Sequence, residues 1–92
     1  MKNIYLCGKF ERDTSSNKKF SKAKEDVKKM HPNSHVVNPW HHLNNDNVAQ
    51  CRRDLKRCNY IYMFGRYEED PKLIESKWFK NARLTKKLIF EF

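Results

Sequence analysis

Glycine, proline and cysteine are scarce in this sequence, with two, three and three copies among 92 residues. Cys7, Cys51 and Cys58 form no CxxC pair, and a sparse, odd set of cysteines favours free thiols over a disulfide framework. Long hydrophobic runs are also missing, because no apolar stretch approaches the roughly 18 residues that a membrane-spanning helix needs. We therefore expect a protein with no membrane partner.

The first seven residues contain one lysine and about four apolar residues. This stretch is too short for the apolar region of a signal peptide, and we interpret it as a first strand. We accordingly expect a cytoplasmic protein.

Hydrophobic residues nevertheless make up 38% of the chain and aromatic residues 13%, which is enough to form a core. The length predicts one domain, residues 1–92. A chain this short buries only a modest core, so a homo-dimer or a larger homo-oligomer that buries more surface is a reasonable expectation.

Positive charge dominates the chain, with 20 Lys and Arg residues against 11 Asp and Glu residues and a formal net charge of +9. This balance favours anionic partners such as nucleotides, nucleic acids or acidic surfaces. A solvated surface that only keeps a small protein soluble explains the same charge, and both explanations stay open.

Short apolar stretches alternate with segments of helical periodicity. The predicted strands are 3–6, 34–38, 60–64 and 88–90. The predicted helices end at Met30, Cys58 and Ala82. The apolar face of the first helix includes Phe20, Ala23, Val27 and Met30. The apolar face of the second includes Val48, Cys51, Leu55 and Cys58. We expect a loop over 40–45, with Asp46 capping the second helix.

Alternating strands and helices predict an α/β domain with a parallel sheet. The economical arrangement is a small three-layer sandwich, with a four-stranded sheet in the order 2-1-3-4, flavodoxin- or Rossmann-like. Ligands bind such sheets at the carboxyl ends of the strands where the order reverses, here between the first and third strands. The turns expected there are Gly8-Lys9-Phe10 and Gly65-Arg66-Tyr67, with Glu75 just behind the second.

Several residues near these turns are candidates for chemistry. Glu75, near the start of the third helix, is a candidate nucleophile or general acid/base. Apart from any resemblance, the sequence favours the simpler explanation, a solvated glutamate that interacts well with the helix dipole. Gly8 with Lys9 and Arg12 is a weak candidate for holding a phosphate or ribose. Glu69 and Asp70 belong to an acidic loop that can bind a base, while Asp70 also suits a helix cap.

Metal and cofactor chemistry is not expected. The spacing of His41, His42, Cys51 and Cys58 fits none of the usual zinc patterns. Cys51 and Cys58 lie on the apolar face of a helix, where free cysteine behaves as a small hydrophobic residue.

Four short motifs occur in one order along nearly the whole chain: Ile4-Tyr5-Leu6-Cys7-Gly8, Val36-Val37-Asn38-Pro39, Cys51 to Cys58 followed by Asn59-Tyr60-Ile61-Tyr62-Met63, and Gly65 followed ten residues later by Glu75. In this pattern the chain resembles a family of small uncharacterised phage and bacterial proteins related to nucleoside 2-deoxyribosyltransferases. The resemblance implies a Rossmann-like sheet, often assembled as homo-oligomers, and chemistry at the N-glycosidic bond of a nucleoside or nucleotide without a cofactor.

The resemblance also implies roles for residues. Glu75 would attack C1′ of the sugar as in a retaining glycosidase, and water or a second base would then take the sugar. Cys7, Gly8, Asn38 and Gly65 would line the substrate site, Lys9 and Arg12 would meet a 5′-phosphate, and Glu69 or Asp70 would lie near the base.

The chain departs from the family pattern close to Glu75. Lys72 and Leu73 replace small residues that let a sugar approach the helix. These departures keep two alternatives open, a non-catalytic nucleotide-binding module of the same fold and a basic nucleic-acid-binding protein.

Overall fold

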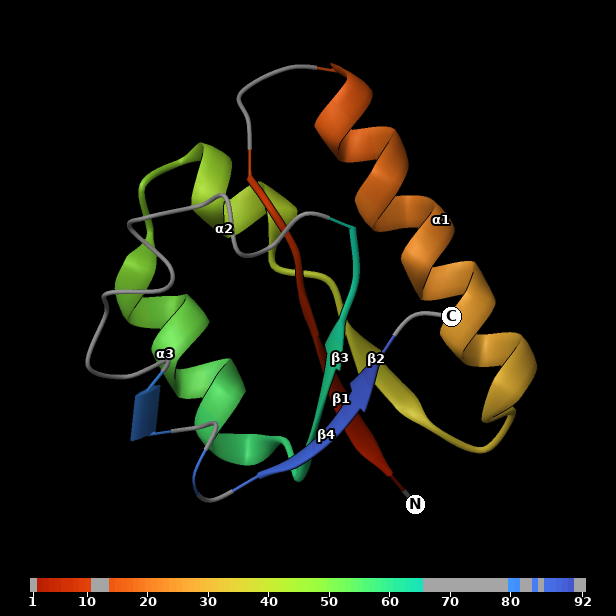
Figure 1. The fold of residues 1–92 in the computed structure, drawn as a ribbon. Helices are drawn as coiled ribbons and strands as arrows, with labels where there is room; N and C mark the ends of the chain where they lie inside the picture. Colours follow the sequence, from red (N-terminus) through yellow and green to blue (C-terminus); the bar gives the residue numbers. More distant parts are fainter. Residues whose placement is uncertain (1, 11–13, 66–79, 82–83, 85, 91–92) are drawn as a thin grey trace.

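The fold was determined as a computed structural model that describes residues 2–10, 14–65, 80–81, 84 and 86–90. Its strands are β1 (Asn3–Cys7), β2 (His35–Val37), β3 (Tyr60–Met63) and β4 (Lys87–Phe90), and its helices are α1 (Thr14–Met30), α2 (Trp40–Asn44) and α3 (Val48–Arg57) (Figure 1). The predicted helix over 71–82 lies largely outside the described residues.

The strands form one sheet in the order β2-β1-β3-β4, and every neighbouring pair is parallel. β1 is hydrogen-bonded on both edges, with Ile4 aligned to Val36 of β2 and to Tyr60 of β3. The mixed α/β class with a parallel sheet and covering helices is therefore confirmed. Its assignment to the flavodoxin- or Rossmann-like folds stays a prediction at this point.

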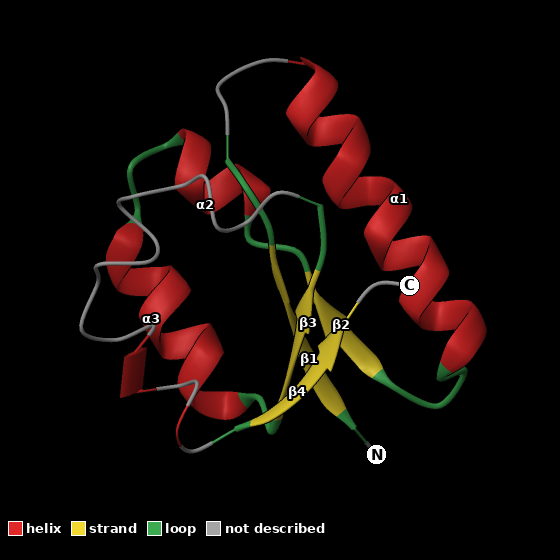
Figure 2. Cartoon of the chain, viewed as in Figure 1, coloured by secondary structure: helices red, strands yellow, loops and turns green. Residues whose placement is uncertain are grey.

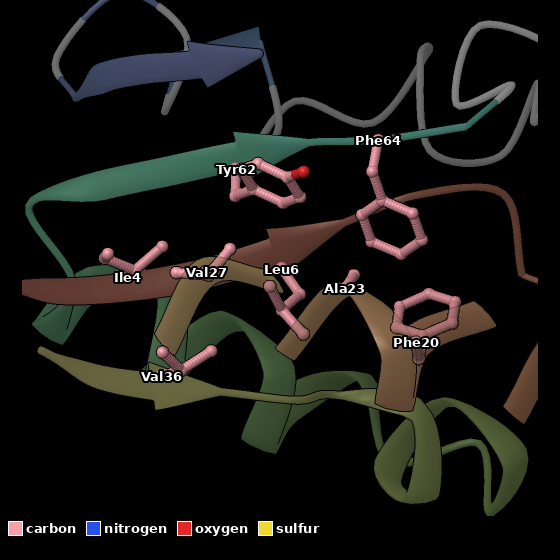
Figure 3. Close-up of a cluster of buried hydrophobic side chains, with 8 residues drawn as sticks. All are labelled: Ile4, Leu6, Phe20, Ala23, Val27, Val36, Tyr62 and Phe64. Atoms are coloured by element: carbon pink, nitrogen blue, oxygen red, sulfur yellow. The ribbon is translucent and has the colours of Figure 1, made fainter. Parts of the chain in front are cut away.

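Helices cover both faces of this sheet (Figure 2). Because successive side chains of a strand point to opposite faces, Ile4 and Leu6 pack on the α1 side while Tyr5 and Cys7 pack on the α3 side. The α1-side core is the larger cluster (Figure 3) and contains Ile4, Leu6, Phe20, Ala23, Val27, Val36, Tyr62 and Phe64. Burial on both faces explains why β1 is a nearly continuous apolar run.

Helix α1 follows the predicted periodicity closely. Phe20, Ala23 and Val27 are buried against the sheet, while its six lysines are exposed or half-buried toward solvent. The prediction that Met30 joins this buried face was wrong, because Met30 is 44% exposed. It is the last residue of the helix, which ends as the chain turns back toward β2 through the hydrogen bond from His31 N to Val27 O.

The connection from β2 to α3 differs from its prediction. Residues 40–44, expected in a loop, form the short helix α2, whose first backbone N–H is met by Asn38. Asp46 does not cap α3: Asn47 does, and its side-chain oxygen accepts a hydrogen bond from Gln50 N at 3.2 Å. Asp46 adopts a left-handed backbone (φ 55°), which directs the chain from α2 into α3.

The first residue of α3 also departs from expectation. Val48, predicted on the buried face, is 45% exposed. The buried face of α3 is narrower and consists of Cys51 and Leu55, followed by Cys58 just after the helix. Within the described part of the chain, no helix is long and apolar enough to cross a membrane.

All three cysteines are free and buried, as predicted. Cys7 and Cys58 belong to the α3-side core with Leu55, and Cys51 is fully buried beside Tyr5. Burial raises the pKa of the Cys51 thiol and raises that of Cys58 to about 11, with the charge of Asp54 adding to both shifts. The thiols of Cys51 and Cys58 therefore stay neutral in the folded protein at physiological pH and act as apolar packing groups.

These thiols predict a loss of stability in alkali. The unfolded Cys58 thiol ionises near its ordinary pKa of 9.0, whereas the folded one holds its proton to about 11. Its contribution to stability is thus fully present below pH 9 and is lost as the pH rises through about 11. Urea unfolding measured from about pH 8 to about pH 11 should show this decline, with a smaller decline in Cys58→Ala. Equal declines in both proteins would contradict the assignment.

Candidate functional site

The candidate site lies at the carboxyl edge of the sheet, where three strands end side by side. β1 continues into Gly8-Lys9-Phe10, β2 into Asn38-Pro39-Trp40, and β3 into Phe64-Gly65. Because β2, β1 and β3 are adjacent and parallel, these three segments share one edge. The hydrogen bond from Phe64 N to Cys7 O (3.0 Å) extends the pairing of β1 and β3 to this edge.

This edge collects five of the residues that the sequence predicts to bind substrate: Cys7, Gly8, Lys9, Asn38 and Gly65. The other predicted site residues, Arg12, Glu69, Asp70 and the proposed nucleophile Glu75, lie outside the described residues. The side chain of Cys7 packs into the α3-side core, so Cys7 reaches the edge through its backbone alone.

Gly8 is closely approached by an aromatic ring of the protein itself. A Cβ added to Gly8 would lie only 2.5 Å from Cζ of Phe64. That ring is held in turn by an edge-to-face contact with Phe20 of α1, with ring centroids 5.0 Å apart (Figure 3). Position 8 therefore requires glycine for a reason within the fold, because any larger residue would clash with Phe64, a part of the core.

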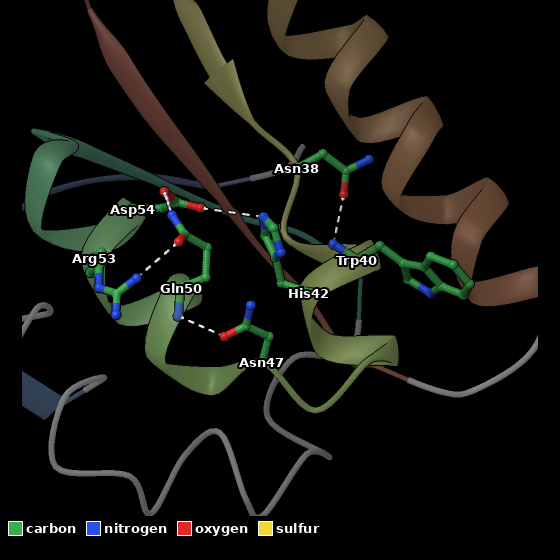
Figure 4. Close-up of polar contacts among 7 residues, drawn as sticks. All are labelled: Asn38, Trp40, His42, Asn47, Gln50, Arg53 and Asp54. Atoms are coloured by element: carbon green, nitrogen blue, oxygen red, sulfur yellow. Dashed lines mark hydrogen bonds and ion pairs between the residues drawn. The ribbon is translucent and has the colours of Figure 1, made fainter.

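Asn38 organises the edge beyond β2. Its side-chain oxygen accepts a hydrogen bond from Trp40 N at 3.1 Å, which satisfies a donor at the start of α2 (Figure 4). The carboxamide NH₂ group of Asn38 makes no hydrogen bond within the described ranges, so it can donate to a ligand at this edge.

Aromatic side chains gather beside Asn38. Trp40 contacts Phe10 of the segment after β1, with ring centroids 6.2 Å apart, and His41 at 5.3 Å. The indole Nε1 of Trp40 is buried and has no hydrogen-bond partner among the described residues. This arrangement is costly unless water or a ligand accepts a hydrogen bond from the N–H group. Sequence reasoning missed Trp40 as a site residue; its position directly after a strand-ending Asn-Pro pair was the available signal.

Gly65 lies at the end of the β3 segment with a left-handed backbone (φ 59°), and no atom of the described residues lies within 4 Å of the place of a Cβ. This conformation favours glycine for a local reason, which is the turn itself. Lys9, half-buried beside Gly8, brings a positive charge to the same edge.

A polar network joins α2 to α3 next to this edge (Figure 4). Asp54 is its centre: Oδ1 accepts a hydrogen bond from Gln50 Nε2 at 2.9 Å, and Oδ2 lies 3.8 Å from His42 Nε2. The Asp54 side chain is only 15% exposed, so its carboxylate is largely covered by its neighbours.

Burial raises the pKa of Tyr5 well above its ordinary value, and the neighbouring thiol of Cys51 adds to the shift. Tyr5 therefore stays protonated and hydrogen-bonds to Cys51 beneath the network of Asp54. In the described ranges no three His, Cys, Asp or Glu side chains are arranged to hold a metal ion.

The contact at Gly8 predicts that Gly8→Ala destabilises the protein by about 1–3 kcal/mol, because the new methyl group must displace the Phe64 ring. Urea unfolding measures the change. The double variant Gly8→Ala/Phe64→Leu is the control, since removal of the ring should make the added methyl group nearly neutral relative to Phe64→Leu alone. An equal cost of Gly8→Ala in both backgrounds would show that the ring is not the obstacle.

The described part of the edge thus offers a carboxamide donor on Asn38, a lysine, and a buried indole N–H beside the half-buried rings of Phe10 and Trp40. Such a set suits a planar, polar ligand with an anionic group. Comparison with known proteins returned no matching family model, no matching curated protein and no matching solved structure.

Proposed function

We propose that this chain binds a nucleoside or nucleotide at the carboxyl edge of its sheet and acts on the N-glycosidic bond, with Glu75 as the nucleophile. The observation that carries the proposal is the strand order. From β1 the chain crosses to β2 on one side, and from β3 it reaches β4 on the other, so the order reverses between β1 and β3. Open parallel sheets bind ligands at such a reversal, and we propose a flavodoxin-like fold for this domain on the same ground.

The described side chains support a nucleotide as the ligand. The rings of Phe10 and Trp40 offer flat surface to a base, and the carboxamide of Asn38 offers a donor. Lys9 would meet a 5′-phosphate together with Arg12, and the backbone at Gly8 and Gly65 would face the sugar. Glu69 or Asp70 would contact the base.

The proposed reaction needs one carboxylate and no cofactor. Glu75 attacks C1′, the C1′–N bond breaks, and the base leaves with the bonding electrons and takes up a proton. Water or a second base then displaces Glu75 from C1′, so that the sugar is released or transferred. A fixed carboxylate stabilises the positive charge that develops on the sugar during both steps.

A non-catalytic nucleotide-binding module is the second candidate. It is favoured by Lys72 and Leu73, which stand where the family that the chain resembles has small residues before its glutamate. Bulky side chains there would keep the sugar from Glu75 while leaving a base-binding edge intact.

The two candidates differ in one assay. The assay incubates each protein with deoxynucleosides and their 5′-monophosphates and measures free base by chromatography. It compares wild type with Glu75→Gln and with the control Glu25→Gln, which changes an exposed glutamate of α1. We expect wild type and Glu25→Gln to release base and Glu75→Gln to lose at least about a hundredfold in rate, because the nucleophile is gone. Ligand-induced thermal stabilisation without released base would support the binding module. The absence of both released base and thermal stabilisation would overturn both candidates.

A further inference from the structure

The solvent-facing side of α3 is strongly basic. Four of its ten residues are exposed cations, Arg52, Arg53, Lys56 and Arg57. They lie opposite the buried pair Cys51 and Leu55, which packs the helix on the sheet. A fifth cation extends this surface, because Lys86 Nζ donates a hydrogen bond to the carbonyl oxygen of Lys56 at 3.2 Å. We call these five side chains the α3 basic face.

No carboxylate within α3 neutralises the α3 basic face. Asp54 is the single acidic residue of the helix. Its Oδ1 accepts a hydrogen bond from Gln50, and its Oδ2 lies 3.8 Å from His42 Nε2 of α2, so the carboxylate is on the side toward α2. Arg53 donates to the neutral side-chain oxygen of Gln50 at 3.2 Å. The acid of α3 is thus turned inward while its cations face solvent.

Helix electrostatics explains only part of this pattern. Cations in the last turn stabilise a helix through its dipole, which accounts for Lys56 and Arg57. Arg52 and Arg53 lie in the middle of the helix, where the dipole gives no such benefit.

The lysines of α1 form a more dilute surface. They are spread over 17 residues, interspersed with Glu25 and Asp26, and Lys28 is committed to the carbonyl oxygen of Ser34 at 2.7 Å. The two helices therefore offer different surfaces: an arginine-rich, locally uncompensated one on α3 and a lysine surface mixed with acids on α1.

We propose that the α3 basic face binds the phosphate backbone of double-stranded nucleic acid without reading its sequence. Arginine presents a planar set of donors that matches phosphate, and a duplex carries the densest array of phosphates along a rod. The remaining exposed residues of α3, Val48 and Ala49, provide no ring on which an unpaired base could stack. This inference uses none of the residues assigned to the nucleotide site and does not depend on that proposal.

The test is binding of the full chain to a labelled duplex of about 20 base pairs, followed by fluorescence anisotropy between about 50 and 200 mM salt. Two triple variants are compared: Arg52→Gln/Arg53→Gln/Lys56→Gln on α3 and Lys18→Gln/Lys22→Gln/Lys24→Gln on α1. Each lowers the formal net charge of +9 by three, so the two variants carry the same net charge and lose it at different places. DNA and RNA duplexes are tested in parallel to tell which nucleic acid is preferred.

Wild type should lose affinity steeply with salt, with a log–log slope of about −4 for four to five phosphates neutralised. The α3 triple variant should bind at least about tenfold more weakly with a slope reduced by about 2.7, while the α1 variant stays within about threefold of wild type. Thermal unfolding checks that the variants fold. If the α3 triple variant does not, the single variants Arg52→Gln and Lys18→Gln replace the pair, and only the first should reduce the slope, by about 0.9.

Three results would overturn the proposal. Equal losses from the α1 and α3 variants would assign binding to net charge alone. Tighter binding of a single strand than of the duplex would reject the duplex as partner. Failure to prefer the duplex would be the third: absence of duplex binding at the lowest salt would assign the α3 basic face to solubility, and tighter binding to an acidic protein or to vesicles rich in phosphatidylserine would assign it to another anion.

Discussion

The pairing of β1 with a parallel neighbour on each edge is the constraint on which the rest of the structure depends. One strand of five residues supplies the hydrogen bonds for both β2 and β3 and side chains for both cores. Its residues from Ile4 to Cys7 are all buried, and only Asn3 at its start is partly exposed. The parallel direction then brings the ends of three strands to one edge, and this places Gly8, Asn38 and Phe64 in one neighbourhood.

The alternation of side chains along β3 and into Phe64 connects the edge to the interior. Phe64 follows Tyr62 on the α1 side, where the two rings stack with centroids 6.0 Å apart, and Phe64 then meets Phe20 of α1 edge-on. The ring that closes on Gly8 is therefore held by the core from two sides. The positions of Gly8 and Phe64 at this part of the edge are fixed by packing rather than by hydrogen-bonded loops, which is consistent with a chain that has only two glycines.

The elements that sequence reasoning located were those with a repeating apolar signal. β1 and β3 are short apolar runs, and Phe20, Ala23 and Val27 repeat at helical spacing, so burial alone specified them. The predictions that Met30 and Val48 are buried were wrong. Periodicity defines which face of a helix is buried, but it does not define how far along the helix the sheet that covers this face extends.

The segment from Trp40 to Asn47 lacked any such signal. Helix α2 has five residues, too few for a period to appear, and it depends on Asn38, a residue outside it. Asn44, Asn45, Asp46 and Asn47 are all acceptable helix caps, and backbone geometry rather than residue type selects Asn47. The contact of His42 with Asp54 could not be predicted for the same reason, because it requires the turn between α2 and α3 to be known first.

The position of Phe64 also limits how this edge can hold an anion. Loops that cradle phosphate use several glycines so that consecutive backbone N–H groups can surround the oxygens. Here the one glycine after β1 has an aromatic ring against the side where a Cβ would be, and that side is closed to a ligand. Any anion at the β1 end must then be met from the opposite side and by side chains, of which Lys9 is the described candidate. Recognition at this edge therefore depends on ring surface, the Asn38 carboxamide and cationic side chains more than on backbone donors.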